Sequence, residues 1–298
     1  MNHTVSTKEL PQNAEMVSHS VTHGQECGIE IREVAGGVCA FVTKKSPARE
    51  GFNEDSIGVI SFGETAGLLI VADGVGGVKS GEIASSTVVE SIQNSVEELY
   101  KSVDPTEPPP ENSVLLRSAI VNGIEEANRK ILSLGIGCAS TVSVIEIQND
   151  TVRPLHVGDS SILVTGLKGK IKLQTINHSP VGFAIESGLL EDVEALHHEV
   201  LHIVSNVVGD DEMRIEIGSP LKMAKRDTVV LASDGLFDNL YQQEIIELGR
   251  KGKLPNCMDR LLDLTSSRML DQQDETPSKP DDLSVILFRR KWTRAKST

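Results

Sequence analysis

Acidic residues recur at the ends of apolar, strand-like runs of this sequence. They follow the runs GLLIVA, TVRPLHV and TVVLAS, and they precede the runs SIGVISF and LSVILF. The residues are Asp73, Asp159 and Asp234 after the first three runs, and Glu54, Asp55, Asp281 and Asp282 before the other two. In an antiparallel sheet the start of one strand lies beside the end of its neighbour. The side chains are therefore predicted to converge on one edge as a carboxylate cluster.

Clustered carboxylates repel one another, and their pKa values rise unless a cation compensates the charge. An all-oxygen set without His or Cys at ligand spacing suits Mg²⁺ or Mn²⁺ better than zinc. Taken singly, each Asp is better explained as a residue that caps a turn. Five such sites in one chain favour the metal cluster instead.

Glycines follow Asp73 in the segment DGVGG. Gly74 lets the backbone carbonyl approach a metal ion and permits a positive φ. The segment lacks the G-x-x-x-x-G-K-[ST] pattern of a phosphate-binding loop, so a nucleotide site is not favoured. A tight turn at a metal ion is the prediction.

Strands and paired helices must position these residues. The predicted strands, rich in Val and Ile, are IEIREV, VCAFVT, SIGVISF, GLLIVA, STVSVIEI, TVRPLHV, SILVTG, KIKLQTI, TVVLAS and LSVILF. Apolar residues at helical spacing predict helices at about 80–102, 112–134, 189–198, 242–251 and 256–271. The proline-rich segment DPTEPPPEN makes a hairpin of the first two. Tight turns join most strands, which predicts antiparallel sheets and an α+β fold.

Composition narrows the class of protein. The 298 residues, 39% of them hydrophobic, are sufficient for one large domain. A net charge of -14 argues against nucleic acid or an anionic membrane as the main partner. The four cysteines form no C-x-x-C pair, and no run of 18 apolar residues occurs. We expect a cytoplasmic protein with a polar, flexible leader at 1–28, a main domain at 29–290 and a basic tail at 291–298.

Six motifs, taken in order, resemble the metal-dependent protein phosphatases of type 2C, the PPM family, in its bacterial branch. They are NEDS (53–56), ADGVGG (72–77), AST (139–141), HVGDS (156–160), SDGLFD (233–238) and DDLSVIL (281–287). The resemblance implies a four-layer αββα sandwich, two antiparallel sheets flanked by helix pairs, with a binuclear metal site at one end. It also implies that residues 178–212 form a flap beside the active site.

The resemblance assigns roles to individual residues. Asp73 would bridge two ions of Mg²⁺ or Mn²⁺, Asp234 and Asp281 would complete one, and Glu54 with the Gly74 carbonyl would hold the other. Asp55 would hold a metal-bound water. Asp159 and Asp238 would bind a third, weaker ion; the alternative for Asp238 is a cap on the helix near Gln242.

Three positions depart from the family pattern. The phosphate-binding Arg is expected at position 50, where this chain has Glu50; a one-residue bulge would bring Arg49 into place. Lys44 and Lys45 are alternative cations, although a solvated charge run is their commoner explanation. Ser161 replaces the Arg that commonly follows GDS, and Ala139 replaces a usual Gly. In the flap, His197, His198 and His202 are best explained as an ordinary surface helix end.

The implied function is hydrolysis of phosphoserine and phosphothreonine in proteins by water activated between two metal ions. The implied partner is a phosphorylated protein, such as a signalling or kinase-regulated protein. No cysteine motif indicates a thiolate nucleophile. Val75 stands where the DGH branch has a histidine proposed as general acid, so the general acid stays open. Two alternatives remain: a catalytically silent regulator of the same fold, and a phosphatase for a non-protein phosphate ester.

Overall fold

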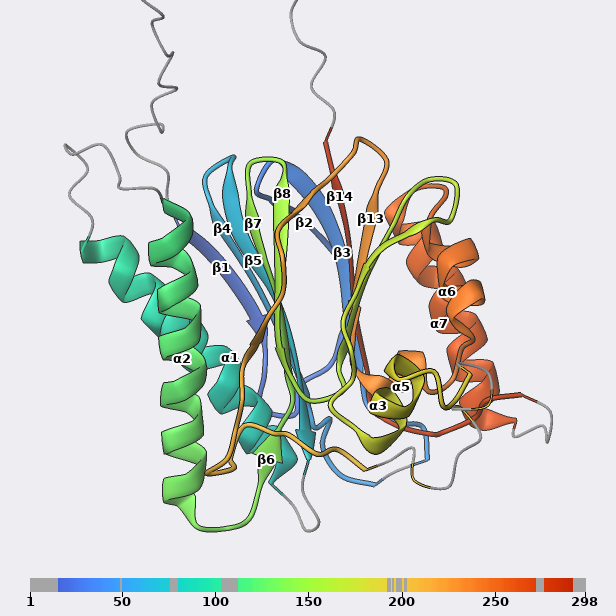
Figure 1. Cartoon of the computed structure of the whole chain (residues 1–298), viewed down its shortest axis with the longest axis horizontal. Coiled ribbons are helices and arrows are strands. Elements are labelled where there is room, and N and C mark those ends of the chain that lie inside the picture. The colour runs from blue at the N-terminus through green and yellow to red at the C-terminus, as the bar shows by residue number, and fades with distance from the viewer. Residues whose placement is uncertain are drawn as a thin grey trace, which may run out of the picture.

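The computed structural model describes residues 16–48, 50–75, 80–102, 112–191, 203–271 and 276–291, together with residues 194, 196 and 200. Two antiparallel sheets lie face to face between two pairs of helices (Figure 1). The predicted α+β fold with two antiparallel sheets and flanking helices is confirmed. Within this part of the chain, no helix combines the length and the apolar character needed to cross a membrane.

The first sheet joins its main strands in the order β1-β4-β5-β7-β8-β11, with β6 paired to β5 and β12 paired to β8. The strands are β1 (Met16–Val21), β4 (Asp55–Phe62), β5 (Ala66–Val75), β6 (Ala139–Ser140), β7 (Val142–Gln148), β8 (Thr151–Val157), β11 (Glu216–Ile217) and β12 (Leu221–Lys222). The second sheet has the order β10-β9-β13-β14-β3-β2. Its strands are β2 (Cys27–Val34), β3 (Gly37–Lys44), β9 (Ser161–Thr165), β10 (Ile171–Gln174), β13 (Thr228–Ala232) and β14 (Leu283–Arg290).

Helices cover the outer faces of both sheets. The helices α1 (Gly81–Ser102) and α2 (Asn112–Leu134) cover the first sheet, and α6 (Gln242–Gly249) and α7 (Leu254–Leu270) cover the second. Two short helices, α3 (Pro180–Glu186) and α5 (Asp234–Phe237), lie at the lower end of the sandwich in Figure 1. The two long helices confirm the hairpin prediction; the predicted helix at 189–198 falls mostly outside the described residues.

The central strands of both sheets are apolar along most of their length because both of their faces are buried. In β5, Leu69 and Val71 face the space between the sheets, whereas Leu68 and Ile70 pack beneath α1 and α2. This alternation follows from the two-residue period of a strand. Full burial of each such side chain stabilises the fold by about 1.5–3 kcal/mol. Apolar layers on both faces therefore fix the position of each strand end.

The flexible leader predicted at 1–28 is wrong for residues 16–28. Residues 16–21 form β1, an edge strand that pairs with β4 along its whole length, and β2 already begins at Cys27. The sequence MVSHSV carries a weak strand signal because an edge strand with exposed polar residues needs little apolar character. The strand β1 is ordered because it pairs with β4 through backbone hydrogen bonds. Residues 1–15 and 292–298 lie outside the described part of the chain.

Candidate metal centre

Asp55 and Asp73 stand opposite one another at one end of the antiparallel pair of β4 and β5. Directly opposed residues have Cβ atoms about 4.5–5.5 Å apart. Asp55 is 1% exposed, so water cannot screen its charge. The register of these two strands thus places two carboxylates side by side in a buried environment, as the sequence predicted.

The backbone after Asp73 passes close to the loop that precedes β4. The Gly74 N–H donates to the Glu54 carbonyl over 3.0 Å. A Cβ on Gly74 would lie 2.1 Å from the carbonyl oxygen of Gly81, so no larger residue fits there. A Cβ on Gly81 would in turn lie 2.7 Å from Oε1 of Glu54. The Glu54 carboxylate therefore sits against the first turn of α1, where the helix dipole favours negative charge.

The second sheet contributes Asp234 and Asp281 from neighbouring strand ends. Asp234 opens α5 directly after β13, and Asp281 lies just before β14. The Ser233 N–H donates to the Ser284 carbonyl over 3.0 Å, and the Ser284 N–H donates to Ser233 Oγ over 3.1 Å. Ser233 Oγ also donates to Oδ2 of Asp55 over 2.8 Å. This last hydrogen bond joins the two sheets at their acidic end.

Asp159 reaches the same end through the turn that follows β8. The Thr141 N–H donates to the Asp73 carbonyl over 2.8 Å, and Thr141 Oγ1 shares a hydrogen bond of 2.7 Å with Ser160 Oγ. Ser140 Oγ donates to the same Asp73 carbonyl over 2.9 Å. Thr141 thus connects the end of β5 to the buried turn that carries Asp159.

Burial and mutual repulsion disfavour the charged form of the central carboxyls. Burial raises the pKa of Asp73 well above its usual range, and the charges of Asp55, Asp234, Asp281 and Asp159 raise it further. Burial and then the Asp282 carboxylate raise the pKa of Asp55, although hydrogen bonds from Ser233 and Ser284 oppose that rise. Asp282 itself accepts the N–H groups of Ser46 and Glu54, each over 2.6 Å. It therefore anchors the loop before β4 to β14.

The pKa values of Asp159 and Asp238, the two residues predicted to hold a third ion, are also raised. Burial, followed by the charges of Asp234 and Asp238, raises the pKa of Asp159 to about 8 against the effect of Lys279. Burial, followed by the charge of Asp234, raises the pKa of Asp238 to about 7, again against Lys279. This end of the sandwich therefore brings together more carboxyl groups than Lys279 alone could compensate if all of them were ionised.

Two oxygens at this end lack a hydrogen-bond partner among the described residues: Oδ1 of Asp55 and Oδ1 of Asp234. An unsatisfied buried polar atom costs about 1–3 kcal/mol, and more when it is charged. Oxygen donors of this kind are the ligands that Mg²⁺ and Mn²⁺ prefer. The residues present therefore fit a centre for hard divalent cations.

Lys279 is a residue of this centre that the sequence analysis did not identify. Its ammonium group contacts the carboxylates of Asp234, Asp238 (2.9 Å) and Asp281 (3.5 Å). Burial disfavours the charged ammonium, but these three carboxylates outweigh burial and raise the pKa of Lys279. The only sequence signal was its place two residues before Asp281, in a turn where most lysines are solvated.

The alternative in which Asp238 caps the following helix is wrong. Tyr241 is the N-cap of α6, and its N–H donates to Oε2 of Glu244 over 2.9 Å. The Asp238 carboxylate instead contacts the Lys279 ammonium. Asp238 therefore belongs electrostatically to the acidic end of the sandwich.

The predicted phosphate-binding residue, Arg49, lies outside the described residues. Of the alternative cations, Lys44 is exposed and Lys45 is half-buried. The Lys45 backbone N–H donates to Oε2 of Glu26 over 3.2 Å, which fixes the chain beyond β3. The identity of the phosphate-binding cation stays a prediction.

Both ends of the predicted flap are hydrogen-bonded next to proposed metal ligands. At its start, the His178 N–H donates to the Gly158 carbonyl (3.0 Å), and the Gly158 N–H donates to His178 Nδ1 (3.1 Å). At its end, Val208 and Ser140 exchange two backbone hydrogen bonds of 2.8 and 2.9 Å. The histidines of the flap centre, His197, His198 and His202, lie outside the described residues.

His156, His178 and Glu216 lie close together below the flap. The two rings stack with centroids 4.4 Å apart and planes inclined by 24°. Ring-nitrogen lone pairs lie in the ring plane, so two nearly parallel rings cannot both direct one at the same ion. The two Nε2 atoms also have partners: His156 Nε2 contacts the Ile176 carbonyl (2.9 Å), and His178 Nε2 contacts Oε2 of Glu216 (3.1 Å). The group holds the flap base rather than a metal.

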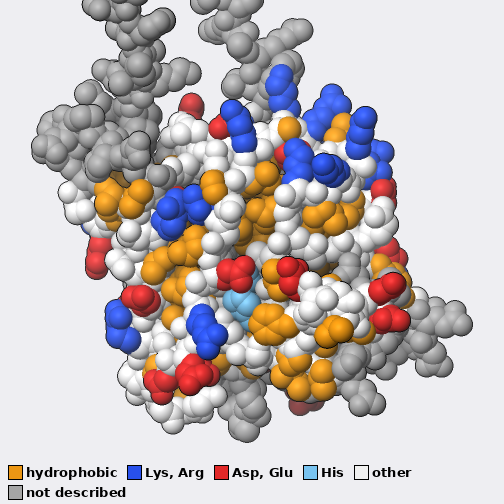
Figure 2. Space-filling view, viewed as in Figure 1, with side chains coloured by type: hydrophobic (Ala, Val, Ile, Leu, Met, Phe, Trp, Pro, Cys, Tyr) orange, Lys and Arg blue, Asp and Glu red, His pale blue; other side chains and the backbone are white. Residues whose placement is uncertain are grey.

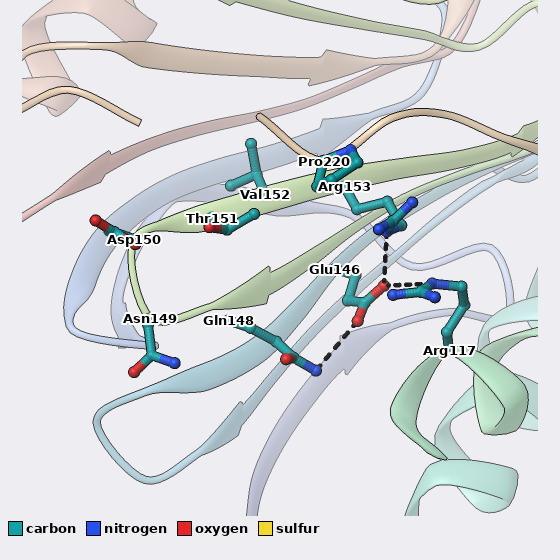
Figure 3. Close-up of a pocket in the computed structure, with 9 residues that line it drawn as sticks. All are labelled: Arg117, Glu146, Gln148, Asn149, Asp150, Thr151, Val152, Arg153 and Pro220. Carbon is teal, nitrogen blue, oxygen red and sulfur yellow. Dashed lines mark hydrogen bonds and ion pairs between the residues drawn. The ribbon is translucent and has the colours of Figure 1, made fainter. Parts of the chain in front are cut away.

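Two pockets lie away from the carboxylates. One, of about 270 Å³, is found at the β7–β8 hairpin, where Glu146 is bonded by Arg117 (3.3 Å) and Gln148 (3.1 Å) and lies near Arg153 (Figure 3). The seven residues of β8 separate this hairpin from the turn of Asp159 by about 20 Å. Its carboxylate is already paired, so the pocket reflects a structural ion network.

Basic side chains also gather at the end of the sandwich opposite the carboxylates. Figure 2 shows Lys and Arg side chains concentrated at the upper end of the visible face. A pocket of about 280 Å³ in the same region is lined by Lys225, Arg226, Arg250, Lys251, Arg289 and Arg290. Arg289 donates to the backbone carbonyls of Gly249 and Gly252. Part of this charge therefore stabilises the end of α6.

Comparisons with known proteins agree with this geometry. The sequence model described as protein phosphatase 2C matches residues 45–273. Protein phosphatase PhpP of Streptococcus pneumoniae is 29% identical over 188 residues, which are 61% of this chain and 72% of that protein. The serine/threonine phosphatase stp of Listeria monocytogenes is 26% identical over 206 residues, 66% of this chain and 77% of that protein.

Solved structures show the same fold. The serine/threonine phosphatase of S. agalactiae superposes with a TM-score of 0.67 at 25% identity, covering 85% of this chain and 99% of that one. Stp1 of Staphylococcus aureus gives a TM-score of 0.69 at 24% identity, covering 85% and 95%. The catalytic domain of PstP, solved with two manganese ions, gives 0.63 at 22% identity, covering 88% and 99%.

The resemblance inferred from the six motifs is thus confirmed by an independent match that spans most of the chain. The chain belongs to the protein phosphatase 2C family of metal-dependent serine/threonine phosphatases.

Proposed function

We propose that this phosphatase removes phosphate from phosphoserine and phosphothreonine in proteins by means of two divalent cations held at the acidic end of the sandwich. Asp73 would bridge the ions, Asp234 and Asp281 would complete one site, and Glu54 with the Gly74 carbonyl would complete the other. The observation that carries this assignment is the meeting of buried carboxylates from both sheets at one end, with pKa values raised by burial and repulsion.

Divalent ions held there would lower the pKa of water so that it can attack phosphorus near neutral pH, and would neutralise charge on the phosphoryl oxygens. The protein's own part is to hold the ligands in place. Asp55 accepts the Ser233 hydroxyl through Oδ2, whereas Oδ1 has no partner among the described residues. Oδ1 can therefore accept a proton from the attacking water and orient it.

Mg²⁺ and Mn²⁺ are the proposed ions. The donor set contains only oxygen, which these hard ions prefer. The solved PstP domain with two manganese ions supports the same number for this chain. The sequence further predicts a third, weaker cation at Asp159 and Asp238, and a phosphate clamp at Arg49.

The proposed substrate is a phosphorylated signalling or kinase-regulated protein in the cytoplasm. The relatives named as serine/threonine phosphatases support the phosphoprotein class. Cys27, Cys39, Cys138 and Cys257 are all unpaired thiols, as expected in a reducing compartment.

A metal-dependent assay on matched phosphopeptides tests the proposal. Phosphothreonine and phosphoserine peptides should release phosphate only with added Mn²⁺ or Mg²⁺, and a phosphotyrosine peptide should react far more slowly. Excess chelator and the Asp73→Asn variant should each abolish release. If phosphoprotein-derived peptides resist hydrolysis while a small phosphate ester is turned over efficiently, the substrate class is wrong. If no substrate is hydrolysed with either metal, the proposed activity is wrong, and the alternative of a catalytically silent regulator is favoured.

A further inference from the structure

Lys279 occupies a built position at the acidic end of the sandwich. The side chain of Asn239, fully buried, accepts the Lys279 N–H through Oδ1 (2.7 Å) and donates Nδ2 to the Lys279 carbonyl (2.8 Å). The Asn239 carbonyl is itself held by Arg268 Nη1 over 2.7 Å. Residues about 40 positions apart in sequence are thereby locked together. Two hydrogen bonds from one buried side chain therefore fix the Lys279 backbone.

The Lys279 ammonium lies on one side of Asp234. It contacts Oδ2 of Asp234, Oδ2 of Asp238 over 2.9 Å and, at a longer distance of 3.5 Å, Oδ2 of Asp281. Oδ1 of Asp234 is buried and has no partner among the described residues. The two oxygens of this carboxylate thus have different roles. Oδ2 accepts from the lysine, and Oδ1 is available to an ion shared with Asp73 and Asp281.

The ammonium lies close to the carboxylates whose charge the first two ions would not compensate. Asp159 and Asp238 are not needed as ligands of those ions, yet both are buried and both lie within the electrostatic reach of Lys279. A buried carboxylate without a nearby cation is costly. A cation at this place keeps these carboxylates ionised at lower cost, and the chain supplies one of its own.

We propose that the Lys279 ammonium is the third cation of this centre, so that the protein binds two divalent ions and no third. The lysine takes the place between Asp234 and Asp238 where a weaker ion would otherwise sit. This inference rests on the proposed two-ion function. Its consequence is that the cation beside Asp238 does not depend on the metal concentration around the protein.

Counting bound Mn²⁺ tests the proposal without any measure of activity. Free Mn²⁺ is followed by electron paramagnetic resonance as the metal-free protein is titrated, at protein concentrations high enough to populate a millimolar site. Wild type should bind two ions per chain. Lys279→Met removes the charge but keeps most of the side-chain volume, and it should bind a third ion with a Kd of about 1 mM, as expected for an ion held by one or two carboxylates.

Matched variants define the control. Lys172 forms a comparable ion pair with Asp227 (2.6 Å), and its side chain is 27% exposed against 26% for Lys279. Lys172→Met should leave the count at two. Lys279→Arg keeps a cation and should also leave it at two. Adding Asp238→Asn to Lys279→Met should remove the third ion again.

A third millimolar ion in wild type overturns the proposal and leaves the two-ion function intact. A count of two in a folded Lys279→Met also overturns it. If wild type binds no ion tightly, the proposed function fails, and the inference fails with it. Should Lys279→Met not fold by circular dichroism, the wild-type and Lys279→Arg counts still decide, because a third ion in either contradicts a resident lysine cation.

Discussion

Asp55 and Asp73 face one another across the antiparallel pair of β4 and β5, each at the end of a strand that is apolar on both faces. Such a pairing is unfavourable by itself because two like charges are held together out of water. The fold stabilises it through apolar layers on either side of the first sheet and through the Ser233 hydroxyl, which donates to Asp55 from the second sheet. The packing of the sandwich thus holds these two carboxylates together against their mutual repulsion.

Asp73→Asn is expected to abolish turnover and to leave the fold intact. The amide keeps the shape of the side chain but removes the charge shared by both proposed ions. Asp234→Asn should have the same effect. Asp150→Asn, at the opposite end of the sheet on the β7–β8 hairpin, serves as the control and should keep full activity. A kcat for Asp73→Asn near that of the control would show that Asp73 does not bridge the ions.

The stability of the metal-free protein should fall as the pH rises from 6.5 to 8.5. In the folded chain the pKa values of Asp159 and Asp238 are about 8 and about 7, against about 3.9 for an unfolded Asp. The folded state therefore binds protons that the unfolded state has already lost. The stability that these protons contribute is fully present below pH ~3.9 and is lost as the pH rises through the folded pKa values. Thermal melting in excess chelator measures the decline.

Two comparisons isolate the carboxyls in that experiment. Asp238→Asn removes one of the titrating groups, so its melting temperature should depend less steeply on pH. Saturating Mn²⁺ should flatten the wild-type curve, because bound ions keep the carboxylates charged in the folded state. A melting temperature that rises over this interval in chelator contradicts the assigned direction of the pKa shifts.

The sequence predicted the convergence of the carboxylates better than it predicted their surroundings. Asp73 and Asp234 were identifiable because each directly follows a run that can only be a buried strand, and strand ends meet at sheet edges. Lys279 carried no such signal, because its burial depends on Asn239, which lies about 40 residues earlier and holds its backbone. The edge strand β1 was missed for a similar reason. Its order comes from pairing with β4, and its own residues are largely polar.

Arg49→Ala is expected to raise KM for a phosphopeptide about tenfold or more. A bidentate, charge-assisted contact with phosphate is worth ~1.5–3 kcal/mol, which corresponds to that loss of affinity. Lys44→Ala and Lys45→Ala should change KM little, since Lys44 is exposed and Lys45 fixes the chain through its backbone. If either lysine variant shows the tenfold effect and Arg49→Ala does not, the bulge hypothesis is refuted.

His178→Ala should loosen the flap without removing a metal ligand. The ring accepts the Gly158 N–H and the Asn206 amide (2.8 Å) at Nδ1, and its loss leaves these donors unpaired. We expect a higher KM for a phosphopeptide with little change in Mn²⁺ affinity, and a stability lower by about 1–3 kcal/mol. His19→Ala, on β1, is the control. An equal increase in KM in both variants would indicate general destabilisation instead of a flap effect.

Gly81→Ala tests whether the close fit around Glu54 sets metal affinity. Alanine is the better helix former, so α1 should not weaken. The added Cβ would nevertheless lie 2.7 Å from Oε1 of Glu54 and 2.8 Å from the Gly74 carbonyl, the two groups proposed to hold one ion. Displacing such supporting geometry typically lowers metal affinity about 10- to 100-fold. Calorimetric titration with Mn²⁺ should show one weakened site.

Gly249→Ala, whose Cβ would approach no atom closer than 3.8 Å, is the control and should titrate as wild type. An unchanged Gly81→Ala titration would mean that Glu54 is not a ligand.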